Sequence, residues 1–120
     1  MDLNLRKKNV LITGSTKGIG RRIANLFAEE GANVAICSRS LKSVNKAVSE
    51  ISLIADGKII GSSCDVKNKE DYVSWINDMA NELGGVDIFI PNVSAGGGMD
   101  SEKNWWENFE IDILGTVRGV

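Results

Sequence analysis

Residues 9–20 read NVLITGSTKGIG, and this stretch decides the fold of the chain. Its first half is a short apolar run, of the kind that is buried on both faces of a parallel sheet. Its second half places glycines at positions 14, 18 and 20, where an amphipathic pattern begins that predicts a helix from about Gly18. The stretch therefore predicts a buried strand, a glycine-rich turn and a helix in direct succession.

Apolar runs and amphipathic patterns alternate along the rest of the chain. The expected strands cover residues 9–13, 33–37, 58–62 and 86–90, and the expected helices begin near Gly18, Ser40, Asn68 and Glu102. Gly31, Gly57 and the pair Gly84-Gly85 are expected to end the first three helices. Strands that alternate with such helices are joined by right-handed crossovers. The sequence thus predicts an α/β fold with a parallel sheet of about four strands.

Each of the first three helices is expected to turn one apolar stripe toward the sheet. The stripe of the first helix comprises Ile19, Ile23, Leu26 and Phe27. The stripe of the second comprises Leu41, Val44, Val48 and Ile51. The stripe of the third comprises Val73, Ile76, Met79, Ala80 and Leu83.

Length and composition indicate one domain of modest charge. The chain has 120 residues, 42% of them hydrophobic, and a formal net charge of −2. This charge gives no reason to expect a nucleic acid or a membrane as partner, and no apolar run approaches the ~20 residues that span a bilayer. Cys37 and Cys64 have no metal-ligand spacing, so we expect two buried thiols and no metal site. We expect a cytoplasmic protein.

The three glycines have distinct roles if the turn holds a pyrophosphate. Such a ligand needs free backbone N–H groups and the positive end of a helix dipole. Gly14 can make the tight turn, Gly18 lets the backbone approach the phosphates, and Gly20 lets the helix pack on the strand. An ordinary strand-to-helix turn is the alternative, but it would not need three glycines in seven residues.

The pattern Thr13-Gly14-x-x-x-Gly18-Ile19-Gly20 resembles the fingerprint of the short-chain dehydrogenase/reductase family, in its compact branch. Further similarity lies in Cys64-Asp65-Val66, in residues 87–92 and in residues 105–116. The resemblance implies that residues 1–120 form the N-terminal half of a dinucleotide-binding domain. Its α/β fold would be built on a Rossmann-type parallel sheet, here with about four strands in the order 3-2-1-4. The cofactor contacts that it implies are Gly14, Ser15, Thr16, Lys17, Gly18, Ile19, Gly20, Ser38, Arg39, Asp65, Val66 and Asn92.

The end of the second strand bears on the choice of dinucleotide. It reads Cys37-Ser38-Arg39 and carries no acidic residue that would hold a free ribose 2′-hydroxyl. Arg39 can bind a 2′-phosphate, Lys17 can add a second positive charge and Ser38 a hydroxyl donor. We expect NADP(H) to be preferred, with NAD(H) possible; the alternative is that both cations are solvated surface groups. The family resemblance implies that Asp65 accepts a hydrogen bond from adenine, unless it is only a turn residue.

Two positions depart from the family pattern. Residues 91–94 replace the usual Asn-Asn-Ala-Gly, and only Asn92 is kept, where its amide can brace the sheet. Asp112 occupies the position of the family's catalytic Asn, whose backbone holds a water beside the catalytic Lys. Asp112 is therefore the one catalytic candidate of the chain, and an ordinary polar helix residue is the alternative.

The family's proton donor, a Tyr followed four residues later by Lys, is absent from these residues. The single tyrosine, Tyr72, is followed by Val73-Ser74-Trp75-Ile76, so we expect a packing or surface residue. We expect the chain to be part of a longer NADP(H)-dependent oxidoreductase that acts on a small carbonyl or secondary alcohol as a homo-oligomer, a dimer or tetramer. Alone, it should be inactive. The alternatives are a truncated, non-catalytic NADP(H)-binding module and a degenerate structural protein of the same fold.

Overall fold

The computed structural model of the chain describes residues 4–92. Its elements in chain order are β1 (Asn9–Ile12), α1 (Gly18–Glu29), β2 (Asn33–Ser38), α2 (Leu41–Ser52), β3 (Ile59–Ser63), α3 (Lys69–Leu83) and β4 (Ile88–Ile90). The expected alternation of strands and helices is confirmed for these seven elements. The helix expected from about Glu102 lies outside the described residues.

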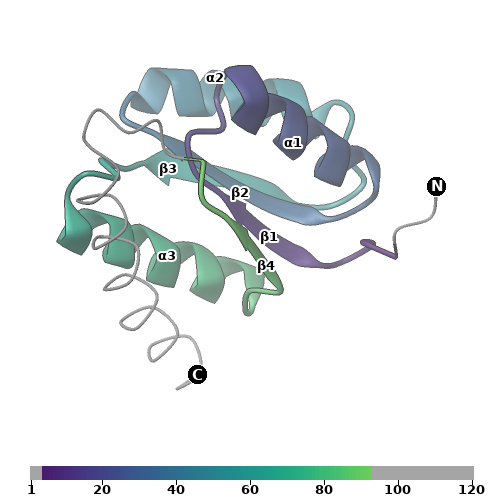
Figure 1. Cartoon of the computed structure of the whole chain (residues 1–120). Coiled ribbons are helices and arrows are strands. Elements are labelled where there is room, and N and C mark those ends of the chain that lie inside the picture. The colour runs from purple at the N-terminus through teal and green to yellow at the C-terminus, as the bar shows by residue number, and fades with distance from the viewer. Residues whose placement is uncertain (1–3, 93–120) are drawn as a thin grey trace.

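The four strands form one parallel sheet in the order β3-β2-β1-β4, as expected from the sequence. Helices α1 and α2 cover one face of the sheet and α3 covers the other (Figure 1). β1 lies between β2 and β4, and Leu11 is in register with Ala35 on one side and Phe89 on the other. Because both faces are covered, the residues from Val10 to Ile12 are fully buried.

Polar caps fix where two of the helices begin. The Ser40 side chain accepts a hydrogen bond from the backbone N–H of Ser43, and Asn68 does the same for Asp71, so both expected starts are confirmed. Gly84 ends α3 in a left-handed conformation, as expected. The expected end of the second helix at Gly57 is wrong, because α2 ends at Ser52.

None of the three described helices is long and apolar enough to cross a membrane.

The sheet separates two hydrophobic cores. Under α1 and α2 the core is aliphatic and is built on Val10, Ile12, Val34 and Ile36. Under α3 the core is aromatic and contains Tyr72, Trp75, Leu11 and both cysteines. Alternate residues of each strand therefore face different helices, which fixes the register of the strands.

The expected apolar stripe of α1 is partly wrong. Ile19 and Leu26 are 72% and 63% exposed, whereas the buried residues of α1 are Gly20, Ala24 and Ala28. These three residues lie four apart and therefore on one face, and their small size lets the helix approach the sheet closely. Larger side chains can then pack only beside the line of contact. In α2 the expected burial of Leu41 is also wrong, because this residue is 53% exposed.

We expect Gly61→Ala to destabilise the fold, because α2 packs directly onto β3 at this position. An added Cβ would lie 2.7 Å from Cγ1 of Val44 and 2.9 Å from Cγ1 of Ile36. Overpacking of this kind costs about 1–3 kcal/mol, which urea unfolding measures as a lower midpoint. Ser63→Ala, at an exposed position of the same strand, is the matched control. Equal midpoints for the two variants would contradict this account of the packing.

Candidate functional site

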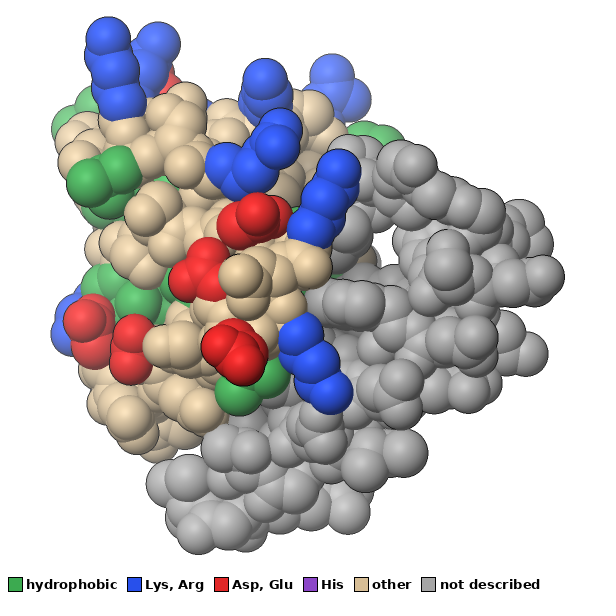
Figure 2. Space-filling model, turned by 90° about the vertical axis from the view of Figure 1, so that its left-hand side faces the viewer, with side chains coloured by type: hydrophobic (Ala, Val, Ile, Leu, Met, Phe, Trp, Pro, Cys, Tyr) green, Lys and Arg blue, Asp and Glu red, His purple; other side chains and the backbone are tan. Residues whose placement is uncertain are grey.

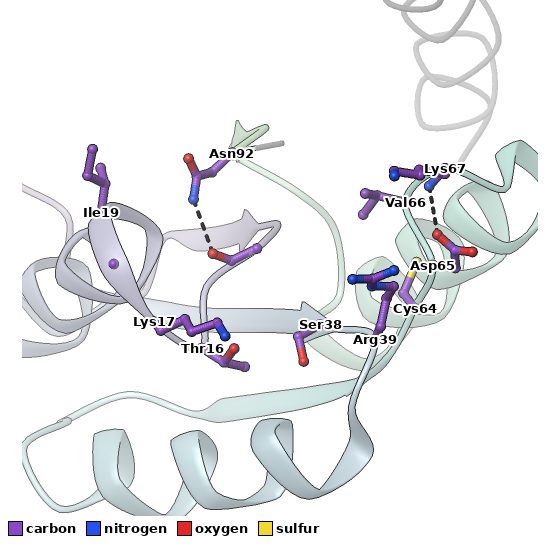
Figure 3. A pocket seen from close by; sticks show the side chains of 12 residues that line it. Thr16, Lys17, Ile19, Ser38, Arg39, Cys64, Asp65, Val66, Lys67 and Asn92 are labelled. Atoms are coloured by element: carbon purple, nitrogen blue, oxygen red, sulfur yellow. Dashed lines mark hydrogen bonds between the residues drawn. The ribbon is translucent and has the colours of Figure 1, made fainter. Parts of the chain in front are cut away.

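A cleft of about 450 Å³ opens at the carboxyl ends of the strands. β1 is followed in the chain by β2 on one side, whereas β4 lies on its other side, so the strand order reverses beside β1. Open α/β sheets bind ligands at such a reversal. The residues that line the cleft are Gly14, Thr16, Lys17, Gly18, Ile19, Ser38, Arg39, Cys64, Asp65, Val66, Lys67 and Asn92 (Figure 3).

The three glycines of the turn have different surroundings. Gly14 and Gly18 have φ angles of +60° and +67°, which favour glycine. A Cβ on Gly14 would lie 2.4 Å from the carbonyl oxygen of Asn92, and a Cβ on Gly20 would lie 2.3 Å from that of Gly14. By contrast, no atom lies within 4 Å of the Cβ position of Gly18, so the backbone there borders open space.

The N-terminus of α1 at this turn has no side-chain cap. Lys17 is the N-cap residue, in an extended conformation, and its side chain accepts no hydrogen bond from the helix. The first turn of α1 contains no acidic residue either, whereas α2 and α3 are capped by Ser40 and Asn68. The first backbone N–H groups of α1 therefore have no capping side chain, and they lie at the positive end of the helix dipole.

Asn92 joins the end of β4 to the glycine turn. Its backbone N–H donates to Oγ1 of Thr13 at 2.9 Å, and its side-chain Nδ2 donates to the carbonyl oxygen of Gly14 at 3.1 Å. The second bond is drawn in Figure 3. Thr13 is fully buried, and its backbone N–H donates to the carbonyl oxygen of Ile90. Asn92 thus braces the turn against the neighbouring strand, the structural role that the sequence suggested.

All the predicted cofactor contacts except Ser15 and Gly20 line the cleft. Ser15 is fully buried, and its hydroxyl donates to the carbonyl oxygen of Ile12 at 2.8 Å. The hydroxyl of Ser38 is engaged as well, because it donates to the carbonyl oxygen of Ser40 and accepts from the Ser40 N–H. The structure therefore gives both serines a role in holding the loops around the cleft.

The sequence analysis missed Cys64 and Lys67, which line the cleft beside Asp65. The backbone N–H of Lys67 donates to Oδ1 of Asp65 at 3.0 Å, and the N–H of Asp65 donates to Oδ2 of Asp71 at 2.8 Å. These bonds curve the segment after β3 back toward the cleft (Figure 3). Proximity in sequence to Asp65 was the available signal for both missed residues.

Charges of both signs surround the cleft. Lys17, Arg39 and Lys67 bring positive charge and Asp65 brings negative charge. Figure 2 shows Lys and Arg side chains next to a group of acidic ones on the face beyond the carboxyl ends of the strands. Residues 4–92 contain no group of three or more side chains suited to a metal ion. The cleft thus presents three cationic side chains and one carboxylate to a ligand.

Tyr72 belongs to the core under α3. It is fully buried, and its ring lies 6.4 Å from that of Trp75 and 6.3 Å from that of Phe89. Burial raises the pKa of its hydroxyl well above the usual value. Of the two expected roles, packing and surface, the structure shows packing. The catalytic candidate Asp112, together with Val93 and Ser94, lies outside the described residues.

A family model described as short chain dehydrogenase matches residues 8–120. The oxidoreductase YvrD of Bacillus subtilis is 34% identical over 122 residues, which cover 98% of this chain and 45% of YvrD. The chain spans about half the length of the curated relatives that it matches.

Two solved structures extend the comparison. A 7α-hydroxysteroid dehydrogenase complexed with NADH and 7-oxo glycochenodeoxycholic acid is 32% identical, with a TM-score of 0.74 over 80% of this chain and 37% of that one. L-sorbose reductase from Gluconobacter frateurii, complexed with NADPH and L-sorbose, shares the fold with a TM-score of 0.81 at 22% identity, over 99% of this chain and 49% of that one. The resemblance seen in the sequence is thereby confirmed, and the chain belongs to the short-chain dehydrogenase family.

Proposed function

We propose that this chain binds NADP(H) as part of a dehydrogenase or reductase that moves a hydride between the nicotinamide and a carbonyl or secondary alcohol. The observation that carries the proposal is the uncapped N-terminus of α1, which meets the cleft beside the open space at Gly18. Membership of the family supports the same chemistry. The relatives act on different small molecules, so the substrate class is taken no further than a carbonyl and its alcohol.

The pyrophosphate fits the glycine turn. At Gly18 the missing side chain leaves room for a ligand against the backbone, and the φ of +67° keeps that position a glycine. The N–H groups of Gly18 and Ile19 would donate to the phosphate oxygens, helped by the helix dipole. Gly14 and Gly20 serve the fit indirectly, because their lack of a Cβ lets the turn pack against Asn92.

The cations near the end of β2 favour a 2′-phosphate on the adenosine ribose. Arg39 directly follows Ser38, the last residue of β2, and both line the cleft together with Lys17. A guanidinium can bind two phosphate oxygens at once, and an acidic side chain that would repel them is absent from this strand end. We therefore assign NADP(H) as the preferred cofactor and NAD(H) as the weaker one.

Asp65 and Val66 would hold the adenine. The Lys67 N–H holds Oδ1 of Asp65, which fixes the carboxylate at the rim of the cleft and leaves Oδ2 to accept from the adenine amino group. Val66 offers an apolar surface to the ring from the same segment. Both contacts depend on the bond from the Asp65 N–H to Asp71, because this bond sets the direction of the segment.

When bound, NADP(H) supplies the hydride donor or acceptor, and the described residues bind and orient it. The reaction also moves a proton to or from the substrate oxygen, which needs a side chain within hydrogen-bond reach. Tyr72 is excluded because its side chain is buried between α3 and the sheet. We therefore place the proton donor outside residues 4–92, with Asp112 as a proposed part of its relay.

A binding module without turnover is the second candidate, and the burial of the single tyrosine favours it. Incubation of the intact protein with NADPH and a panel of aldehydes and ketones separates the two candidates. Loss of NADPH absorbance would support the dehydrogenase or reductase. Binding without loss of absorbance would support the module that only holds the cofactor.

We expect Gly18→Ala to weaken NADPH binding about tenfold or more, because the new methyl group fills the space against the backbone. The positive φ also strains the alanine, so loss of stability must be separated from loss of affinity. Gly84→Ala is the matched control, since Gly84 also has a positive φ and no atom within 4 Å of its Cβ position, but lies at the end of α3. NADPH fluorescence titration of both variants measures the affinity. Equal affinities of the Gly18 and Gly84 variants for NADPH would contradict the proposed binding of the pyrophosphate at the glycine turn.

We expect Arg39→Ala to raise the Kd for NADPH by about 10- to 100-fold and to leave the Kd for NADH nearly unchanged. The reason is the loss of a charge-assisted contact that only the 2′-phosphate makes. Arg22→Ala, which removes an exposed cation of α1 that does not line the cleft, is the control. Calorimetric titration with both cofactors checks the prediction. If the Arg39 variant binds NADPH and NADH with the same affinities as the unaltered protein, the assigned preference for NADP(H) is wrong.

A further inference from the structure

The two cysteines of the chain lie together in the buried core under α3, and one of them reaches the cleft. Cys37 is in β2 and Cys64 directly follows β3. Cys37 is in register with Ser62, so Cys64, two residues further on, points to the same face of the sheet. Both thiols are buried in the core under α3, and Cys64 also lines the cleft.

The two thiols influence each other's ionisation, and their roles differ. The Cys64 thiol, and to a lesser extent the backbone of Gly14, stabilise the thiolate form of Cys37. This stabilisation holds the pKa of Cys37 below its usual value, against the opposing effects of burial and of the Asp71 carboxylate. The same interaction between the thiols raises the pKa of Cys64. Cys37 is therefore the nucleophilic thiol of the pair.

We propose that Cys37 and Cys64 form an oxidisable dithiol, and that its disulfide weakens binding at the dinucleotide cleft. The oxidant is a peroxide that enters through the cleft. The Cys37 thiolate attacks one peroxide oxygen, the O–O bond breaks, and Cys37 becomes a sulfenic acid while hydroxide leaves. The sulfur of Cys64 then displaces the sulfenic oxygen as water. In total, two thiols and one hydrogen peroxide yield one disulfide and two waters.

Formation of the disulfide would displace the part of the cleft that follows β3. The strand spacing and the rise of two residues separate such diagonal Cα atoms by about 8 Å, whereas a disulfide requires less than about 7 Å. Closure therefore pulls Cys64 toward β2 and takes the adjoining Asp65 with it. Figure 3 shows Cys64, Asp65 and Arg39 around the same end of the cleft.

Peptide mapping tests the oxidation itself, independently of any cofactor. The protein is treated with hydrogen peroxide, its remaining thiols are alkylated, and it is digested with trypsin without reduction. Cleavage after Arg22, Arg39, Lys58 and Lys67 places the two cysteines on separate peptides, 23–39 and 59–67. We expect mass spectrometry to find these peptides joined, and separate after reduction. If both cysteines are recovered alkylated, or joined only to other cysteines, the proposal is overturned.

NADPH titration tests the effect on the cleft, and this half of the inference rests on the proposed function. We expect the oxidised protein to bind at least tenfold more weakly, and dithiothreitol to restore the affinity. Cys64→Ser, which keeps a donor to Cys37 but cannot form the disulfide, should bind equally well before and after peroxide. Equal binding by the reduced and oxidised unaltered protein overturns the regulatory claim. If the reduced protein binds no NADPH while the joined peptides form, the proposed function fails and the oxidisable dithiol stands.

Discussion

The structure depends on one close contact between backbones, at which the turn after β1, the start of α1 and the end of β4 meet. The carbonyl oxygens of Gly14 and Asn92 occupy the places where side chains on Gly20 and Gly14 would be. Two hydrogen bonds from Asn92, to Gly14 and to Thr13, hold the three segments in this contact. Glycine is therefore required there for packing, before any ligand is considered.

This contact explains why the N-terminus of α1, with its uncapped N–H groups, lies at the cleft. It draws the N-terminus of α1 against the ends of the strands, and the small residues that follow on the same face, Ala24 and Ala28, keep the helix close to the sheet. No capping side chain satisfies the first N–H groups of α1, so they remain available where the strand order reverses. Packing and the proposed anion binding thus use different glycines of one turn, in which Gly18 alone lies beside open space.

The sequence predicted the sheet and its helices because apolar runs, caps and glycines are local signals, as at Ser40, Asn68 and Gly84. It failed at Ile19 and Leu26, because periodicity counts apolar residues and does not detect that small residues bring α1 closest to the sheet. For the site, the contacts predicted from the family fingerprint include most of the residues that line the cleft. The sequence did not reveal that Ser15 turns inward, or that hydrogen bonds bring Cys64 and Lys67 to the cleft, since these contacts depend on the paths of loops.

The central claim is that the uncapped N-terminus of α1 receives the pyrophosphate of a nicotinamide dinucleotide. The most direct measurement is an NMR titration of the ¹⁵N-labelled protein with NADPH. The account predicts that the amide signals of Gly18 and Ile19 shift most and saturate together, while that of Gly84 stays in place. Saturating shifts confined to the capped starts of α2 and α3, at the amides of Ser43 or Asp71, would contradict it, as would the absence of any shift.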